Sequence, residues 1–219
     1  MADYIFKDEM ERKLSVGKLV CLARTYKKHA IEMNSKFPEK PVLFLKPASS
    51  VIFDGGSIIY PKMSKCLHHE VELGVVIGKK CKNVSKKEAL DYVFGYCVCL
   101  DITARDIQSE LKKKGLPWGI AKGFDTFAPI SNIVLKEKVS NPNDLDFWLK
   151  VNGEIRQSSN TNNMVFSIEQ IIEFISNVMT LEVGDLIMTG TPEGVDEIHK
   201  GDVLEADLND ICKLKVDVK

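Results

Sequence analysis

The chain has 219 residues, of which 44% are hydrophobic and 28% charged, and its net charge is −1. This balance is typical of a soluble globular protein that buries a core, and it excludes the broad basic surface that binds nucleic acid or an anionic membrane. The six cysteines show no CxxC pair and no zinc-type Cys/His spacing, which favours a reducing compartment. No apolar run is long enough for a membrane span or a signal peptide, so we expect neither a membrane protein nor a secreted one.

Short apolar runs bounded by turn residues predict strands along the chain. They cover Val42–Lys46, Glu70–Gly78, Val98–Leu100, Phe147–Val151, Leu186–Thr189, Val203–Leu208 and Cys212–Val218. Asn152-Gly153 has the composition of a two-residue hairpin turn, and Asn209-Asp210 joins the last two predicted strands. Both turns favour antiparallel pairing.

Capping boxes predict where helices begin, because a Ser or Thr is followed three residues later by an acid or amide that returns a hydrogen bond. The pairs are Ser85 with Glu88 before KKEALDYVF, Thr103 with Asp106 before ARDIQSELKKK, and Ser167 with Gln170 before IEQIIEFISNVM. A weaker helical pattern covers Tyr26–Asn34. Because no linker or repeat divides the chain, we predict one α+β domain, residues 1–219, built mostly on antiparallel sheet.

Two glutamates interrupt the alternation of the predicted strand 70–78. Glu70 and Glu72 are two residues apart, so their side chains point to the same face. Two carboxylates that close raise each other's pKa unless a cation lies between them. A solvated face of an edge strand would also explain the pair. Asp101 follows the apolar run Val98–Leu100 at the end of a strand. With Asp101 as a third member, the carboxylates would form an all-oxygen site suited to Mg²⁺, Mn²⁺ or Ca²⁺.

Five further residues are candidates for chemistry. Arg105 and Gln108 are three apart on a predicted helix and share a face, which a solvated polar pair would also explain. Lys122 lies in the small-residue segment GIAKGF, an unusual setting for a surface charge. His29 and Glu32 are also three apart, the spacing of a minimal general base, although such pairs often arise by chance.

Six segments together resemble the fumarylacetoacetate hydrolase family, specifically its short-chain branch of acylpyruvate hydrolases and oxaloacetate decarboxylases. They are PVLFLKP (41–47), HHEVELGVVIGKK (68–80), GYCVCLDITARDIQ (95–108), KKKGLPWGIAKGFDTFAPIS (112–131), LKVNGEIRQ (149–157) and DLIMTGTPEGV (185–195). The resemblance begins near Lys18, which makes residues 1–17 an N-terminal extension. It implies a mixed β-sandwich roll, mostly antiparallel sheet with a few short helices, usually in a homodimer.

The resemblance also implies roles for individual residues. The matched positions are Glu70, Glu72 and Asp101 as ligands of Mg²⁺ or Mn²⁺, Lys122 and Gln108 as polar groups beside the metal, Arg24, Tyr26, Arg105 and Thr191 as substrate contacts, and His29 with Glu32 as the dyad that activates water. One segment departs from the family pattern. Where relatives usually have Gly-Arg-Asn-Tyr, this chain has Ala23-Arg24-Thr25-Tyr26.

The activity implied by the resemblance is magnesium-dependent cleavage of the C–C bond of acylpyruvates, such as acetylpyruvate and fumarylpyruvate, to pyruvate and a carboxylic acid. Oxaloacetate decarboxylase activity is expected beside it, because oxaloacetate presents the same 2-oxo acid head. An isomerase or tautomerase of a related 2-oxo acid and a non-catalytic metal-binding protein on the same fold are the alternatives. The expected partner is a small 2-oxo acid, with no nucleic acid and no membrane. We expect the cytoplasm, with the mitochondrion as the alternative.

Overall fold

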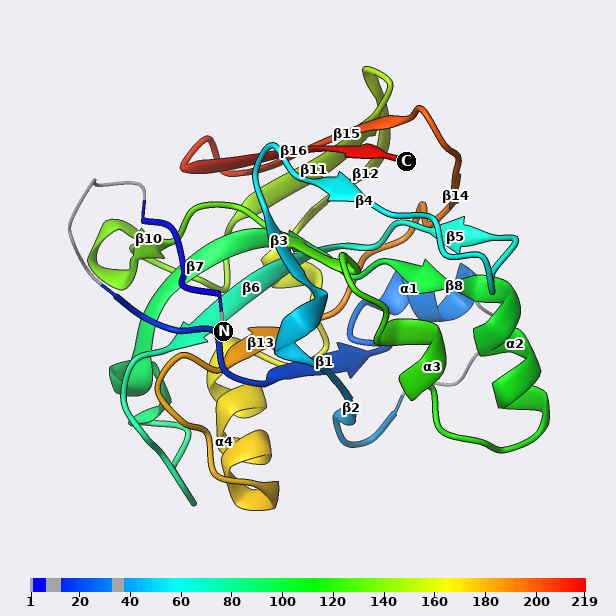
Figure 1. Cartoon of the computed structure of the whole chain (residues 1–219). Coiled ribbons are helices and arrows are strands. Elements are labelled where there is room, and N and C mark those ends of the chain that lie inside the picture. Colours follow the sequence, from blue (N-terminus) through cyan, green and yellow to red (C-terminus); the bar gives the residue numbers. More distant parts are fainter. Residues whose placement is uncertain (1, 7–12, 33–37) are drawn as a thin grey trace.

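Three β-sheets carry the fold (Figure 1). The structure is a computed structural model that describes residues 2–6, 13–32 and 38–219, apart from the side chains of His29, Ala30 and Glu32. The largest sheet has eight strands. In pairing order they are β2 (Val42–Lys46), β1 (Leu19–Ala23), β13 (Leu186–Met188), β6 (Val71–Ile77), β7 (Val93–Leu100), β9 (Ala128–Ile130) and β3 (Val51–Phe53), with β10 (Val134–Leu135) also paired to β7.

The two smaller sheets have five and three strands. The five-stranded sheet is β12 (Glu154–Asn160), β11 (Asp146–Val151), β15 (Val203–Leu208), β16 (Cys212–Val218) and β4 (Ser57–Ile58). The three-stranded sheet is β14 (Glu197–Ile198), β5 (Leu67–His68) and β8 (Thr103–Ala104). Parallel pairing is confined, among the described strands, to β1 with β13, β4 with β16 and β3 with β9. The predicted α+β fold built mostly on antiparallel sheet is confirmed.

The helices are short and lie around the sheets (Figure 1). They are α1 (Lys27–Glu32), α2 (Arg105–Lys113), α3 (Gly119–Lys122) and α4 (Ile168–Val178), and 3-10 turns occur at Ala48–Ser50, Ala89–Tyr92, Lys136–Lys138 and Thr161–Asn163. Helices α2 and α3 contact each other beside the three-stranded sheet, and α4 lies against the large sheet. None of the helices in the described ranges combines the length and the apolar character that a membrane crossing requires.

The predicted strands are all present. The bounds of β2, β15 and β16 are as predicted, whereas β7 begins at Val93 rather than Val98. Gly95 interrupts the apolar pattern inside β7, and it is needed because an added Cβ would overlap the carbonyl of Val134 on the paired strand β10. Asn152 and Gly153 have positive φ angles of 52° and 83°, as a tight hairpin turn of this composition requires.

One capping box forms as predicted and two do not. The Ser167 hydroxyl accepts from the Gln170 amide, and the Gln170 side chain accepts from the Ser167 amide, at the start of α4. The helix predicted after Ser85 is wrong, because the chain makes only a 3-10 turn before β7 pairs with β6 from Val93 onward. The Ser85 hydroxyl instead bonds the Glu88 carboxylate at 2.6 Å. Tertiary strand pairing overrides the local helix signal there.

The capping box predicted at Thr103 is also wrong. Helix α2 begins at Arg105 without a side-chain cap, and Thr103 belongs to β8. The Thr103 hydroxyl donates to the carbonyl of Asp101, and the Asp106 carboxylate accepts from the Ser64 hydroxyl at 2.7 Å. Helix α1 lies within the weak helix predicted over 26–34, whose residues 33 and 34 are outside the described part of the chain.

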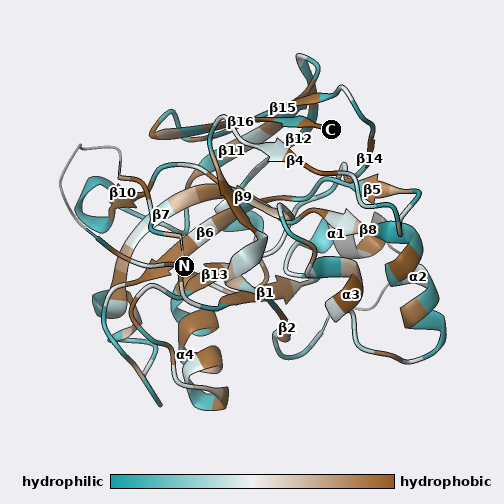
Figure 2. Cartoon of the chain, viewed as in Figure 1, coloured by the Kyte–Doolittle hydropathy of each residue, from teal (hydrophilic) through white to brown (hydrophobic). Residues whose placement is uncertain are grey.

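The core fills both faces of the large sheet. All seven residues of β6 are buried, and on one face Val71, Leu73 and Val75 pack with the inner faces of β11, β15 and β16 and with α4. On the other face the apolar cluster includes Cys97 on β7 and Leu186 on β13. Figure 2 shows hydrophobic residues along β1, β7 and β13. The interpretation of 70–78 as a solvated edge strand is therefore wrong, and both of its glutamates need another explanation.

The first residues of the chain pack on this core. Tyr4 is buried, and its hydroxyl donates to the carbonyl of Gly184 at 2.9 Å. The amide of Tyr4 donates to Leu14 O at 2.9 Å, so residues near the start pair with residues 14–16. The described residues of segment 1–17 thus contribute to the second face of the large sheet.

Replacing Ser167 with alanine is expected to lower the free energy of unfolding by about 1 kcal/mol, because the first turn of α4 loses its side-chain cap. Urea unfolding followed by circular dichroism measures the change. The matched control is Ser158→Ala, at an exposed position of strand β12, where we expect a change within about 0.5 kcal/mol. Equal stability of the two variants would contradict the assignment of a stabilising cap.

Candidate active site

Three carboxylates meet at one end of the β6–β7 pair. Glu70 precedes β6, Glu72 lies within it, and Asp101 follows the last residue of β7. Antiparallel pairing of Val71 with Leu100 brings these positions together, and one oxygen from each carboxylate lies within 4.8 Å of the other two. The three residues are only 6%, 1% and 1% exposed. The structure therefore brings together the predicted ligand set, and ligation itself stays a prediction.

Buried carboxylates this close require a counter-charge. Burial raises the pKa of Glu72 well above its usual range, and the neighbouring Asp101 and Glu70 raise it further. The Gly190 amide, which donates to Glu72 Oε2 at 2.7 Å, and the charge of Lys122 lower this pKa, but the net shift is still upward. An all-oxygen, three-carboxylate donor set of this size fits Mg²⁺ or Mn²⁺ rather than zinc. The chemistry of the donors thus agrees with a divalent cation.

Lys122 is buried against the carboxylates. Its Nζ contacts Glu70 Oε2 at 2.9 Å and Thr103 Oγ1 at 2.6 Å, and it pairs with Asp101. Burial lowers the pKa of Lys122, but Asp101 and Glu70 raise it more, so the net shift is upward and the side chain is an ammonium. The unusual setting noted in GIAKGF reflects a position inside the site.

Sequence reasoning missed a second buried lysine. Lys46, at the end of β2, is 1% exposed, and its Nζ lies 2.8 Å from Asp101 Oδ1. It also donates to the carbonyls of Ile102 at 3.0 Å, Lys122 at 2.6 Å and Phe127 at 2.8 Å. Lys46 therefore ties Asp101 to the segment that carries Lys122. The available signal was a lysine that ends the apolar run of PVLFLKP.

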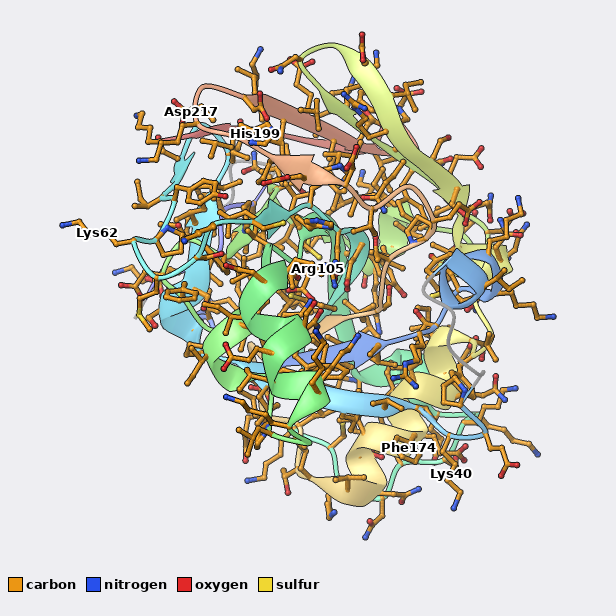
Figure 3. All side chains as sticks on the ribbon, turned by 90° about the vertical axis from the view of Figure 1, so that its right-hand side faces the viewer. Lys40, Lys62, Arg105, Phe174, His199 and Asp217 are labelled. Atoms are coloured by element: carbon orange, nitrogen blue, oxygen red, sulfur yellow. The ribbon has the colours of Figure 1, made fainter. Side chains whose placement is uncertain are left out.

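Arg105 and Gln108 face the site rather than solvent. Arg105 pairs with Glu70 through Nη2, and its Nη1 donates to Gln108 Oε1 at 2.6 Å. Gln108 is 4% exposed, so the interpretation of the two as a solvated pair is wrong. Figure 3 views the molecule from this side and labels Arg105 at the start of α2. Nearby His68 is neutral at pH 7, because burial and the Arg105 charge lower its pKa to about 4.

A pocket opens beside these groups. Its lining includes the predicted residues Arg24, Glu70, Glu72, Arg105, Gln108, Lys122 and Thr191. Apolar side chains form another part of the wall, where the rings of Phe44 and Trp118 lie 5.9 Å apart between centroids. Lys112 also lines the pocket and was not predicted. The pocket therefore combines a carboxylate cluster, several cations and an aromatic surface.

The segment that departs from the family pattern is held firmly. Arg24 has a φ of 61°, a left-handed conformation that is uncommon for a residue with a side chain. Thr25 is buried, and its hydroxyl donates to the carbonyl of Thr189 at 2.7 Å. An added Cβ at Gly190 would overlap the Thr25 hydroxyl, so the two segments fit closely. Tyr26 is 1% exposed and contacts the core, so its hydroxyl is not part of the pocket lining.

Gln157 is a further buried residue that sequence reasoning missed. Its Nε2 donates to Thr191 Oγ1 at 2.8 Å, and its Oε1 accepts from the Val71 amide at 3.0 Å. His69 Nδ1 lies 3.0 Å from the same oxygen and must carry the hydrogen. Thr191 in turn donates to the carbonyl of Val71 at 2.9 Å. Gln157 thus fixes the Thr191 loop to the start of β6.

The predicted dyad belongs to helix α1. His29 and Glu32 lie on α1, but their side chains are outside the described part of the chain. Helix α1 follows directly from Arg24–Tyr26, so its backbone is adjacent to one side of the pocket. The role of the dyad therefore stays a prediction.

Comparisons with known proteins extend over nearly the whole chain. A model of the family described as fumarylacetoacetate (FAA) hydrolase C-terminal matches residues 18–219. Oxaloacetate tautomerase FAHD1, mitochondrial, from Bos taurus is 49% identical over 201 residues, which cover 92% of this chain and 91% of the relative.

Solved structures give the same picture. Fumarylpyruvate hydrolase from Pseudomonas aeruginosa, in complex with Mn²⁺ and pyruvate, has a TM-score of 0.94 at 32% identity, covering 99% of this chain and 95% of that chain. 5-Carboxymethyl-2-hydroxymuconate delta-isomerase from Mycobacterium smegmatis has a TM-score of 0.83 at 37% identity, covering 94% and 80%. These likenesses confirm the predicted α+β fold of the fumarylacetoacetate hydrolase type.

Proposed function

The chain belongs to the fumarylacetoacetate hydrolase family, and from this premise we propose that it is a divalent-metal-dependent enzyme that interconverts the keto and enol forms of oxaloacetate. The observation that carries the proposal is the cluster of three buried carboxylates, within 4.8 Å of one another, beside a pocket lined by cations. The choice of oxaloacetate is supported by the activity in the name of the bovine relative at 49% identity. No observation on the described residues favours a non-catalytic role.

The chain's own side chains suit this reaction. Glu70, Glu72 and Asp101 would hold the cation, which when bound supplies Lewis-acid stabilisation of negative charge on the 2-oxo group. The predicted base His29 would accept the C3 proton, and a proton returned to the enolate oxygen completes the enol. Lys122 now donates to Glu70, Asp101 and Thr103, and as a buried ammonium it can turn one N–H to the substrate oxygen on which charge develops. Arg105 and Gln108 are hydrogen-bonded to each other, and this contact orients both at the pocket wall.

The test is direct measurement of tautomerisation. Oxaloacetate freshly dissolved in its enol form is followed by ultraviolet absorbance with purified protein, with EDTA, and after Mn²⁺ or Mg²⁺ is restored. We expect enzyme-dependent acceleration that EDTA removes and the cation restores. Acceleration that persists after complete metal removal, or its absence with either cation, would overturn the proposal. Pyruvate release, measured in parallel, separates decarboxylation from tautomerisation.

Hydrolysis of acylpyruvates is the second candidate. It is supported by the likeness to fumarylpyruvate hydrolase, whose structure holds Mn²⁺ and pyruvate, at a TM-score of 0.94. Hydrolysis needs a water nucleophile as well as the 2-oxo acid site, and His29 with Glu32 is the predicted base for that water. Oxaloacetate decarboxylation shares the head group but needs no water. A single site could serve both reactions, with the dyad important chiefly for hydrolysis.

Replacing Glu32 with alanine is expected to lower acylpyruvate cleavage by about 10²–10⁴-fold, because general-base assistance of this size is lost. Oxaloacetate decarboxylation should fall much less. Pyruvate release from acetylpyruvate and from oxaloacetate measures both effects. The matched control is Glu39→Ala, an exposed glutamate of the same part of the chain, which should change neither rate. Equal losses in both reactions would count against a role for Glu32 in activating water.

Two further expectations remain proposals. We propose a homodimer, which light scattering coupled to gel filtration would test. We propose a cytoplasmic location. The mitochondrion is the alternative, because the name of the bovine relative includes the word mitochondrial. Fractionation of cells that express the native chain distinguishes the two compartments.

A further inference from the structure

We infer that Arg24 and Lys112 together form a recognition site for the second carboxylate of a dicarboxylic 2-oxo acid. The inference rests on the proposed function, because it assigns a substrate class to the same pocket. It predicts that the protein prefers substrates such as oxaloacetate or fumarylpyruvate over monocarboxylic 2-oxo acids such as acetylpyruvate. Lys112 is newly assigned to substrate binding. Arg24, already a predicted substrate contact, is now assigned to the second carboxylate.

The cations around the pocket are not all paired with carboxylates. Four cations line it, namely Arg24, Arg105, Lys112 and Lys122. Arg105 is paired with Glu70, and Lys122 is paired with Glu70 and Asp101. Within the described ranges, Arg24 and Lys112 have no carboxylate within ion-pair distance. Their charges are therefore available to an anionic group of a ligand.

An aromatic contact places the Lys112 side chain at the pocket. Its Nζ lies 5.3 Å from the centre of the Trp118 ring, and Trp118 packs near Phe44 in the pocket wall. Such a cation–π contact holds the ammonium in place without neutralising its charge. Lys112 is on the last turn of α2, the helix that begins with Arg105. Arg105 and Lys112 therefore both reach the pocket from the same rigid helix. A freely moving surface lysine would lack this fixed position.

The backbone of Arg24 is held in an uncommon conformation. Its φ of 61° is a strained conformation, and such strain tends to be kept where surrounding structure enforces it for function. Here the next residue enforces it, because the Thr25 hydroxyl donates to Thr189 O at 2.7 Å and the Thr25 carbonyl accepts from the Val165 amide at 2.7 Å. Hydrogen bonds of the Thr25 hydroxyl and of the Thr25 carbonyl thus anchor this segment, while Arg24 lines the pocket.

The positive charges of Arg24 and Lys112 repel each other. Burial lowers the pKa of Lys112, and the charges of Arg105 and Arg24 lower it further. Neighbouring like charges without a counter-ion favour an anion between them. Because Arg105 and the carboxylate cluster lie where the 2-oxo acid head is proposed to bind, a second carboxylate extending along the pocket would meet Arg24 and Lys112. A neutral acyl tail would gain nothing from this pair.

The test compares substrates that differ in their second carboxylate. In the Lys112→Met variant we expect kcat/KM for oxaloacetate and fumarylpyruvate to fall by about ten- to a hundredfold, the usual effect of losing one charge-assisted hydrogen bond. For acetylpyruvate the change should be under about threefold. Lys113→Met is the matched control, since it removes the same charge from the next, exposed residue of α2 and should alter neither value. Arg24→Gln should show the same selectivity as Lys112→Met.

A binding measurement separates this inference from the proposed function. Calorimetry on the Mn²⁺-loaded protein compares 3,3-difluoro-oxaloacetate, which has no C3 proton, with pyruvate. Lys112→Met should weaken the dicarboxylate about ten- to a hundredfold and leave pyruvate unchanged. If that pattern is found while no 2-oxo acid is turned over, the recognition site stands and the proposed reaction fails. Equal weakening of both ligands, or unchanged affinity for both, would overturn the inference.

Discussion

Replacing Glu72 with glutamine is expected to have two effects of opposite sign. Affinity for Mn²⁺ and turnover of oxaloacetate should each fall by about a hundred- to a thousandfold, because a charged ligand worth several kcal/mol is lost. The metal-free protein should be as stable as the wild type or more stable, by up to about 1 kcal/mol. A residue with a purely structural role would give a loss of stability.

The reason lies in the surroundings of Glu72. The side chain is 1% exposed, and burial together with Asp101 and Glu70 raises its pKa more than Gly190 and Lys122 lower it, so the ionised form is unfavourable when no metal ion is bound. Glutamine has nearly the same shape, and its amide oxygen can accept the hydrogen bond that the Gly190 amide now gives to Glu72. The substitution therefore removes repulsion from the metal-free state and removes attraction from the metal-bound state.

Calorimetric titration with Mn²⁺ and urea unfolding in EDTA measure the two effects separately. The control is Glu154→Gln, at an exposed position of strand β12, which should alter neither the Mn²⁺ affinity nor the stability. Retained Mn²⁺ affinity in Glu72→Gln would show that Glu72 is not a ligand. A marked loss of metal-free stability would show that the carboxylate is needed for folding rather than for holding a cation.

Only part of the carboxylate cluster could be predicted from local rules. Residues two apart on a strand share a face, which placed Glu70 beside Glu72. The end of a buried strand marked Asp101 as a candidate, but its proximity to the glutamates depends on the pairing of β6 with β7 and was implied by the family resemblance. The same kind of rule found the cap of α4 at Ser167. The rule failed at Ser85, because the residues that would have continued the helix instead pair with β6. Local signals hold where tertiary pairing does not compete with them.

The residues that were missed have partners far away in the sequence. Lys46 contacts groups between Asp101 and Phe127, and Gln157 joins Val71 to Thr191. Neither residue belongs to a local pattern, so no spacing rule points to it. The short strands such as β5 and β8 were missed for a related reason, because two residues are too few to show a period.

Replacing Lys46 with methionine is expected to lower the free energy of unfolding by about 3–5 kcal/mol, the usual cost of removing one partner of a buried ion pair. Methionine keeps the apolar stem but removes the ammonium, which is 2.8 Å from Asp101 Oδ1. The carbonyls of Ile102 and Phe127 lose their donor as well. Lys46 holds Asp101 against the backbone of Lys122. We therefore expect the Lys46→Met variant to lose Mn²⁺ affinity as well as stability.

A double-variant cycle tests whether the loss comes from the Asp101 pair. Asp101→Asn should cost less in the Lys46→Met background than in the wild type, by more than about 1 kcal/mol, because one of the two cations that it would leave unpaired is already gone. Lys40→Met is the matched control, since Lys40 is exposed just before β2 and should change stability by less than about 0.5 kcal/mol. Urea unfolding in EDTA measures every variant. Additive losses would mean that Lys46 stabilises the fold through its three carbonyl contacts and not through Asp101.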